Sequence, residues 1–455
     1  MYLSRIYPNE TPPRHAWRLK VDLKERLLLT THRSPGLKVH DLDSMAELFV
    51  IQTVGPYTHL EYDPDAGIAV FDEDDDLEIW KLQKPSPGQD LSDFARGQFV
   101  KWNKIPAIPG MRGFHLKDGI LAVVSQQGTT TYYDLVTSPD QPTLLQTLSH
   151  DRGAIGYLDK TPSTLVLCHD DLTRCYSPLN GSLLGTFPPP PTVFLAHYTI
   201  RRPEARRGLD ELVSTDVVYT GMIESVDFEE IRPAAFYGGK EWKACHVDGP
   251  YLVILSDMSR LFVCTDYEAV LRALEGEERE RIMKSTCCVF DIEVGEINLD
   301  ADPGMERYTG DTNWLSVCDG RAAFGAIDHV MILPLPPKSS TAYVKSPHAL
   351  ALPTARDMEI SCLSLVPDGL FTIWGYLQRT SSSPGYHRMI LRNAVRVLWF
   401  DGRGKKIESE DRELALEKSA TEIQMEAEGW TASDDDGEEW TDDDGVEEWT
   451  DEEDG

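Results

Sequence analysis

Residues that could carry out chemistry are scattered along this chain and form no known catalytic motif. The sequence has no G-x-S-x-G elbow for a nucleophilic serine, no H-E-x-x-H pair for zinc and no G-x-x-x-x-G-K-[ST] loop for phosphate. The nearest approach to a cluster is His169 beside Asp170 and Asp171, a trio that fits an exposed polar turn between two strands. We therefore predict that the chain is not an enzyme and binds no cofactor or metal ion.

The eight cysteines indicate buried free thiols rather than a metal site or disulfide bonds. No C-x-x-C pair is present, and most cysteines lie in apolar runs, as Cys287-Cys288 does before Val289 and Phe290. Free thiols persist in reducing compartments. Met1–Trp17 lacks the apolar core of a signal peptide, and no stretch approaches the ~18 apolar residues of a membrane-spanning helix. The expected location is the cytoplasm or the nucleus.

More than half of the net charge of −32 lies at the C-terminus. Asp401–Gly455 holds 23 acids and 5 Lys or Arg, a net charge of −18, whereas the preceding 400 residues carry −14. A segment so acidic buries too little apolar surface to offset the entropy of ordering it, which predicts a disordered tail. The acidic balance also argues against binding nucleic acid or an anionic membrane through bulk charge, and we predict neither partner.

The tail repeats a Trp-Thr step three times, each followed by an acidic block. The indoles are Trp430, Trp440 and Trp449. Because an indole gains nothing from exposure to water, we interpret the repeat as a surface for a basic protein, in which carboxylates attract the partner and indoles contact its Lys and Arg. Duplication of a low-complexity segment is the alternative. Three hydroxyl residues with an acid three positions on are candidate phosphorylation sites, namely Ser433, Thr441 and Thr450.

A basic cluster interrupts the acidic body and is a second candidate partner-binding site. Its members are Arg201, Arg202, Arg206 and Arg207. Clustered guanidinium groups can bind an acidic or phosphorylated peptide. The alternative interpretation is an exposed charged loop.

One hairpin recurs seven times along the chain and would position any site. Each copy has a short aliphatic run, a turn rich in Gly, Asp, Ser or Pro, and a second alternating run, which is typical of paired antiparallel strands. The copies are Leu27–Leu42, Gly67–Leu82, Ile120–Leu135, Thr164–Ser177, Tyr251–Thr265, Ala322–Leu333 and Leu370–Trp399. Further short candidates between the hairpins raise the count to about four strands per repeat.

A spacing of ~40–45 residues with four strands per repeat predicts a β-propeller of the WD-repeat kind. We expect an all-β fold of about seven four-stranded blades over residues 17–400, after an N-terminal segment 1–16 and before the disordered tail 401–455. Insertions are expected at about 188–236 and 266–285, the second with a helix from Tyr267 to Lys284 capped by Asp266. Trp17–Asp22 is the predicted closing strand. A β-sandwich is the competing architecture, although one sandwich usually ends near ~250 residues.

The first two repeats resemble the propeller of fungal F-box proteins with WD-repeat-like domains. The carrying residues are HAWRLKVDLKERLLLTTHRSPGLKVHDLDS from His15, HLEYDPDAGIAVF from His59 and DLEIWKL from Asp76. The resemblance implies a substrate receptor of a cullin-RING ubiquitin ligase, in which the propeller holds the target and the F-box holds the adaptor. No F-box pattern is found before Trp17, and the Trp-Asp signature is altered to pairs such as His40-Asp41 and Trp80-Lys81.

We predict a non-enzymatic protein-interaction module that is monomeric and binds a protein partner such as a ubiquitin-ligase substrate. Two alternatives stay open. A nuclear chaperone-like protein would bind basic proteins through the acidic tail. An enzyme would use side chains that several blades bring together in the central channel, and inward carboxylates and histidines meeting in one pocket would favour it.

Overall fold

The computed structural model places the propeller in the unit Met1–Gly404. It describes residues 4–8, 16–32, 36–52, 54–55, 58–73, 76–84, 95–106, 108–138, 140–150, 157–169, 172–188, 193–201, 213–224, 242–256, 260–274, 276–293, 314–326, 329–343, 347–353, 358–383 and 386–400. The predicted disordered tail, residues 401–455, lies outside the described residues.

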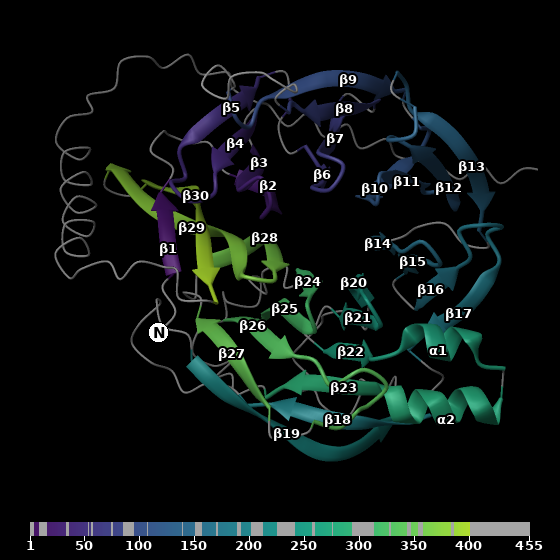
Figure 1. Ribbon diagram of the computed structural model, residues 1–455. Coiled ribbons are helices and arrows are strands. Elements are labelled where there is room, and N and C mark those ends of the chain that lie inside the picture. The colour runs from purple at the N-terminus through teal and green to yellow at the C-terminus, as the bar shows by residue number, and fades with distance from the viewer. Residues whose placement is uncertain are drawn as a thin grey trace, which may run out of the picture. The chain divides into compact units, whose positions relative to one another are not determined.

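Five sheets have four strands each and form separate blades (Figure 1). Four of them are antiparallel meanders in chain order. These are β2 (Ala16–Asp22), β3 (Leu27–His32), β4 (Leu37–Asp41) and β5 (Glu47–Ile51); β6 (Leu60–Asp63), β7 (Ile68–Glu73), β8 (Asp76–Leu82) and β9 (Phe99–Ile105); β10 (Met111–Lys117), β11 (Ile120–Ser125), β12 (Thr129–Asp134) and β13 (Thr143–Ser149); and β14 (Tyr157–Lys160), β15 (Leu165–Cys168), β16 (Thr173–Tyr176) and β17 (Leu183–Phe187).

The fifth blade closes on the N-terminal segment. It contains β28 (Met358–Val366), β29 (Gly369–Ser383) and β30 (Tyr386–Trp399), and β1 (Ser4–Pro8) pairs antiparallel with β30. The predicted closing strand is therefore wrong, because Trp17–Asp22 lies in β2 and pairs with β3. β1 lies in the N-terminal segment 1–16, for which no strand was predicted, and its pairing partner lies almost 400 residues away.

The prediction of about seven four-stranded blades is wrong in one respect, because the remaining strands form a single ten-stranded sheet. It holds two four-strand meanders. The first is β20 (Trp242–Asp248), β21 (Tyr251–Ser256), β22 (Leu261–Cys264) and β23 (Cys287–Ile292), and the second is β24 (Leu315–Cys318), β25 (Arg321–Ala326), β26 (His329–Pro334) and β27 (His348–Pro353). The hairpin of β18 (Phe194–Ile200) and β19 (Val213–Glu224) joins them, since β18 pairs parallel to β23 and β19 pairs antiparallel to β27.

The first strands of successive meanders surround the centre of the propeller unit. They neighbour one another in the order β2, β6, β10, β14, β20, β24 and β28, and β28 lies beside β2 (Figure 1). All seven predicted hairpins are present as strand pairs, from β3–β4 to β29–β30. Hairpins form from sequence neighbours, so local alternation and turn residues are enough to indicate them.

Apolar side chains fill the space between successive blades. Leu27 and Leu29 of β3, for example, pack with Ala69 and Phe71 of β7 in one buried cluster. Every described residue of β3 is buried, because the strand has a neighbouring blade on each face. A further cluster contains Leu28 of β3 with residues of β28, β29 and β30, such as Phe371. Packing between blades therefore also continues where the ring closes.

The insertion after β22 forms two short helices rather than the single predicted helix. They are α1 (Tyr267–Arg272) and α2 (Glu277–Thr286), with Gly276 at the start of α2 in a positive-φ conformation that breaks the helical path. The predicted cap is confirmed, because the Asp266 side chain accepts a hydrogen bond from Ala269 N. Neither of these described helices is long and apolar enough to cross a membrane.

All eight cysteines are free, as predicted, and seven of them are buried. Burial raises the pKa of thiols such as Cys288 and Cys362 above the usual range. His169 is buried as well, which corrects its interpretation as an exposed turn residue.

Removing β1 should destabilise the propeller by opening the outer edge of β30. We expect a chain that starts at Asn9 to unfold at an apparent Tm about 5 °C lower than the full chain, and to self-associate through the uncovered strand edge. A chain that starts at Ser4 keeps β1 and is the matched control. Differential scanning calorimetry and light scattering measure both effects. Equal Tm values for the two truncated chains would show that β1 does not close the ring.

Candidate functional site

A band of polar residues follows the first strands around the centre of the propeller unit. One residue at the same register in each strand contributes, namely Lys20, Glu61, His115, Asp159, His246, Ser316 and Ser364. Apolar residues flank most of them and pack into the core between blades, as Leu60 and Tyr62 do around Glu61. Because side chains alternate along a strand, the polar residue lies on the opposite face of the strand from these neighbours. We call these seven residues the polar band.

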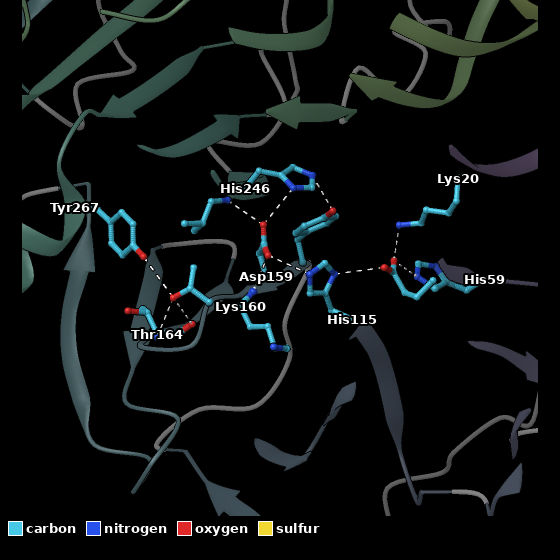
Figure 2. Close-up of polar contacts among 12 residues, drawn as sticks. Lys20, His59, His115, Asp159, Lys160, Thr164, His246 and Tyr267 are labelled. Atoms are coloured by element: carbon cyan, nitrogen blue, oxygen red, sulfur yellow. Dashed lines mark hydrogen bonds and ion pairs between the residues drawn. The ribbon is translucent and has the colours of Figure 1, made fainter. Parts of the chain in front are cut away.

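Five members of the polar band form a continuous chain of charged and imidazole–carboxylate contacts across four blade boundaries (Figure 2). Lys20 Nζ lies 2.9 Å from Glu61 Oε1. His115 bridges the next two boundaries, with Nδ1 3.4 Å from Glu61 Oε2 and Nε2 3.2 Å from Asp159 Oδ1. His246 Nδ1 lies 3.3 Å from Asp159 Oδ2. Each contact joins strands that are distant in sequence, so the chain ties blade to blade.

Other groups complete the coordination of the two carboxylates. His59 Nε2 lies 3.3 Å from Glu61 Oε1. The backbone N–H groups of Lys160 and Val247 donate to Asp159 Oδ1 and Oδ2 at 2.6 and 2.9 Å. The side chains of Glu61 and Asp159 are only 7% and 3% exposed, so these partners replace the water that burial removes.

The positive neighbours keep both carboxylates ionised. Burial alone would raise the pKa of Glu61, but the charge of Lys20 and the contacts with His115 and His59 outweigh it and hold the pKa well below the usual range. Burial likewise opposes ionisation of Asp159, and His115 and His246 hold the pKa of that carboxyl well below its usual range. Both residues are therefore anions at neutral pH.

The same contacts make His115 a cation. Burial would lower its pKa, but the charges of Asp159 and Glu61 and the hydrogen bonds to them raise the pKa to about 9. Each ring nitrogen lies within 3.4 Å of a carboxylate oxygen, although the Nε2 contact with Asp159 is an ion pair without hydrogen-bond geometry. Charges thus alternate in sign from Lys20 through Glu61 and His115 to Asp159.

Tyr157 extends the chain by one hydroxyl group. Its Oη lies 2.7 Å from His246 Nε2, and burial together with the charges of Asp159 and Glu61 raises the pKa of this phenol well above its usual range. The phenol, the imidazole of His246 and the carboxylate of Asp159 therefore contact one another in series. The result is a hydroxyl–imidazole–carboxylate arrangement at the centre of the unit.

Carboxylates at the ends of the first strands form a second series of contacts between blades. Tyr62 Oη donates to Asp22 Oδ2 at 2.6 Å, and Gly119 N donates to Asp63 Oδ2 at 2.6 Å. Asp319 N donates to Asp248 Oδ2 at 2.8 Å. In Asp22 and Asp63 the other oxygen accepts backbone N–H groups of its own turn, so one carboxylate both shapes a turn and joins two blades.

The polar band joins the first strands of successive blades. Inward carboxylates and histidines meet in it, which is the arrangement expected of a central-channel enzyme. Each oxygen of Glu61 and Asp159 also contacts a cationic or N–H group of the protein. No group of His, Cys, Asp and Glu among the described residues could hold a metal ion.

The predicted site residues lie elsewhere, and most fall outside the described residues. Trp430, Trp440 and Trp449 of the tail, the phosphorylation candidates Ser433, Thr441 and Thr450, and Arg202, Arg206 and Arg207 of the loop are all in this group. Arg201 is described and is exposed. Its backbone holds the start of β19, because Arg201 N donates to Asp216 O at 2.9 Å and Arg201 O accepts from the Thr215 hydroxyl.

A signal for the polar band is present in the sequence, although it matches no motif of a known site. In most first strands the polar-band residue stands between two apolar neighbours, as in Leu60-Glu61-Tyr62 and Phe114-His115-Leu116. A charged residue in one strand, taken alone, predicts a solvent-facing position. Alignment of the first strands on the turns that follow them shows that each polar-band residue stands two or three residues before its turn. The charges then alternate in sign from one strand to the next.

Comparison with known proteins finds likeness in solved structures alone. No family model matches the chain, and no curated protein matches it. The WD40 repeats of RRP9 are 12% identical with a TM-score of 0.48, covering 87% of this chain and 97% of that one. Sqt1 of Saccharomyces cerevisiae is 10% identical with a TM-score of 0.47, covering 86% and 97%. U3-55K is 11% identical with a TM-score of 0.45, covering 88% and 98%. The architecture described above rests on this chain's own strand pairing.

His115 should make the stability of the propeller depend on pH between neutrality and pH 9.5. Its pKa is raised in the folded state, so its contribution is complete below the ordinary value near 6.5 and is lost as pH rises through about 9. We expect the difference in unfolding free energy between the native chain and His115→Gln to shrink by roughly 3 kcal/mol from pH 6 to pH 9.5. Urea unfolding over this range measures it.

His348→Gln is the matched control, because His348 is 58% exposed and pairs with Asp216 at the surface. Its difference from the native chain should vary little with pH. If His115→Gln does not fold, NMR titration of the imidazole in the native chain gives the pKa directly. A measured value below 7 would contradict the bridging role.

Proposed function

We propose that this chain is a non-enzymatic protein-interaction propeller. The observation that carries the proposal is the polar band, because its buried charges satisfy one another and hold successive blades together. A ring stabilised in this way is a rigid support, and the loops at its rims can vary without disturbing it. Recognition by such a protein takes place on loops and blade edges rather than by reaction at the centre.

The resemblance of the first two repeats extends the proposal to a substrate receptor of a cullin-RING ubiquitin ligase. The propeller would bind the target protein and present it to the ligase. The loop Arg201, Arg202, Arg206 and Arg207 would contact acidic or phosphorylated residues of the target. The Trp-containing tail would attract basic proteins, and the protein would act as a monomer in the cytoplasm or nucleus.

Affinity purification of the full chain from cells tests this proposal. We expect recovery of ubiquitin-ligase adaptor subunits together with target proteins, and loss of targets in a variant with all four loop arginines changed to alanine. A chain that ends at Glu428 should lose basic partners alone, because it lacks the three indoles and their acidic blocks. Arg272→Ala with Lys284→Ala removes positive charge from exposed positions of α1 and α2 and serves as the control.

Recovery of no adaptor would contradict the ligase role while leaving the interaction role in place. Recovery of the same proteins by the full chain, the loop variant and a heat-denatured sample would contradict both.

A second candidate function, acid–base catalysis, is favoured by the contact between Tyr157 Oη and His246 Nε2 at 2.7 Å. A hydroxyl beside an imidazole that a carboxylate orients is the arrangement of nucleophilic hydrolases. This candidate predicts hydrolysis of activated esters that falls at least tenfold in Tyr157→Phe. The interaction proposal predicts the same background rate for both chains, because burial keeps the phenol protonated. Tyr251→Phe is the control, since Tyr251 lies outside the ion-pair chain.

A further inference from the structure

The hairpin β18–β19, which lies beside β23 (Figure 1), carries another series of hydroxyl, imidazole and carboxylate groups. Thr220 of β19 places its Oγ1 2.7 Å from His197 Nδ1 of β18. The other ring nitrogen, His197 Nε2, lies 2.8 Å from Asp291 Oδ2 of β23. Arg260 Nε and Nη2 donate to the two oxygens of Asp291 at 2.7 and 2.8 Å. We call Thr220, His197 and Asp291 the hairpin triad.

A β-bulge places Thr220 beside the imidazole. His197 pairs with Gly221 and the next residue, Tyr198, pairs with Tyr219, so Thr220 is an extra residue of β19 in this register. Gly221 has a φ of 130°, a backbone conformation that favours glycine. Bulges redirect a side chain and occur frequently next to active sites. The local backbone therefore brings a hydroxyl to a histidine that regular alternation would leave on separate faces.

Asp291 fixes the roles of the two imidazole nitrogens. Burial opposes ionisation of Asp291, but the hydrogen bonds from His197 and Arg260 and the charges of both groups lower its pKa. A carboxylate only accepts hydrogen bonds, so the proton of the neutral imidazole lies on Nε2 and is donated to Asp291. The lone pair of Nδ1 is then directed at the Thr220 hydroxyl, as a general base requires.

The hydroxyl of the hairpin triad is exposed, whereas its base and carboxylate are shielded. Thr220 is an exposed residue, while the side chains of His197 and Asp291 are 15% and 12% exposed. The hydroxyl has a second acceptor in His197 O at 3.2 Å, and the contact with the imidazole is the shorter of the two. A molecule in solution can therefore reach Thr220 Oγ1 without displacing the imidazole from Asp291.

We propose that the hairpin triad is a nucleophilic site that takes acyl groups from activated carboxylic esters. Thr220 Oγ1 attacks the carbonyl carbon and forms a C–O bond, while its proton passes to His197 Nδ1. The tetrahedral intermediate then expels the alcohol of the ester, which takes the proton from His197. Water attacks the acyl-threonine with His197 again as base and releases the carboxylic acid. This activity goes beyond the proposed function, which assigns no reaction to the hairpin.

A fluorophosphonate probe applied to the full chain tests the inference. The probe loses fluoride and forms a P–O bond with a hydroxyl that a neighbouring base makes nucleophilic. We expect one labelled site, which mass spectrometry of the digested chain should place at Thr220. The full chain should also hydrolyse p-nitrophenyl acetate faster than the variants without the triad.

Variants locate the reaction. Thr220→Val keeps the shape of the side chain and removes the hydroxyl, so labelling should be lost and the rate of ester hydrolysis should fall about tenfold or more. Thr220→Ser keeps the hydroxyl and should retain labelling and hydrolysis, whereas His197→Gln should lose both. Thr147→Val is the matched control, because Thr147 is an exposed strand residue whose hydroxyl contacts another threonine. Unchanged thermal unfolding confirms that each variant is folded.

Three results would overturn the inference: no labelling of the full chain, labelling at another residue such as Tyr157, or equal labelling and hydrolysis by Thr220→Val and Thr147→Val. A purely structural role for the hairpin triad predicts the first or the third result. None of them depends on whether the full chain recovers adaptors or targets from cells, so failure of this site and failure of the proposed function are told apart.

Discussion

The rest of the propeller unit depends on one constraint, the alternation of charge between first strands of successive blades. His115 shows it most directly, because its imidazolium lies between carboxylates from two other blades, 3.4 Å from Glu61 and 3.2 Å from Asp159. Taking these charges out of water is costly, and incomplete pairing would leave the cost uncompensated. Two like charges at adjacent positions would repel each other at short range with little screening. The order of the blades around the centre therefore satisfies electrostatics as well as apolar packing.

The charged part of the polar band stops at β20, and a different connection takes over at the next boundary. β24 and β28 contribute Ser316 and Ser364 in place of charged residues, while outside them the hairpin β18–β19 joins β23 to β27. Asp291 of β23 attaches this hairpin, because His197 of β18 lies 2.8 Å from its carboxylate. Arg260 donates to the same buried carboxylate at 2.7 and 2.8 Å. Burial opposes ionisation of Asp291, but these contacts lower its pKa. Cohesion is thus distributed between an inner chain of charges and an outer strand connection.

What the sequence could predict follows from the range of each interaction. The hairpins were predictable because turn and strand residues such as Leu37–Asp41 lie within a few positions of their partners. The pairing of β1 with β30 and of β18 with β23 was not, since edge strands are chosen by what they cover and a short apolar run is compatible with several partners. Gly276 was an available signal for the break between α1 and α2, but the prediction ran one helix through it from Tyr267 to Lys284. The polar band was not predicted because Glu61 and Asp159 are joined only through His115, which lies some 50 residues from each of them in the sequence.

The polar band also makes the centre of the unit costly to change. A molecule that displaced His115 from Glu61 or Asp159 would leave a buried charge without its partner. Loss of the Asp159 carboxylate would remove the partner of His115, of His246 and of the Val247 backbone N–H together. Residues at the rims carry no such cost, because a loop can exchange protein contacts for water. The same interactions that fix the centre therefore allow the loops at the rim to change without loss of ring closure.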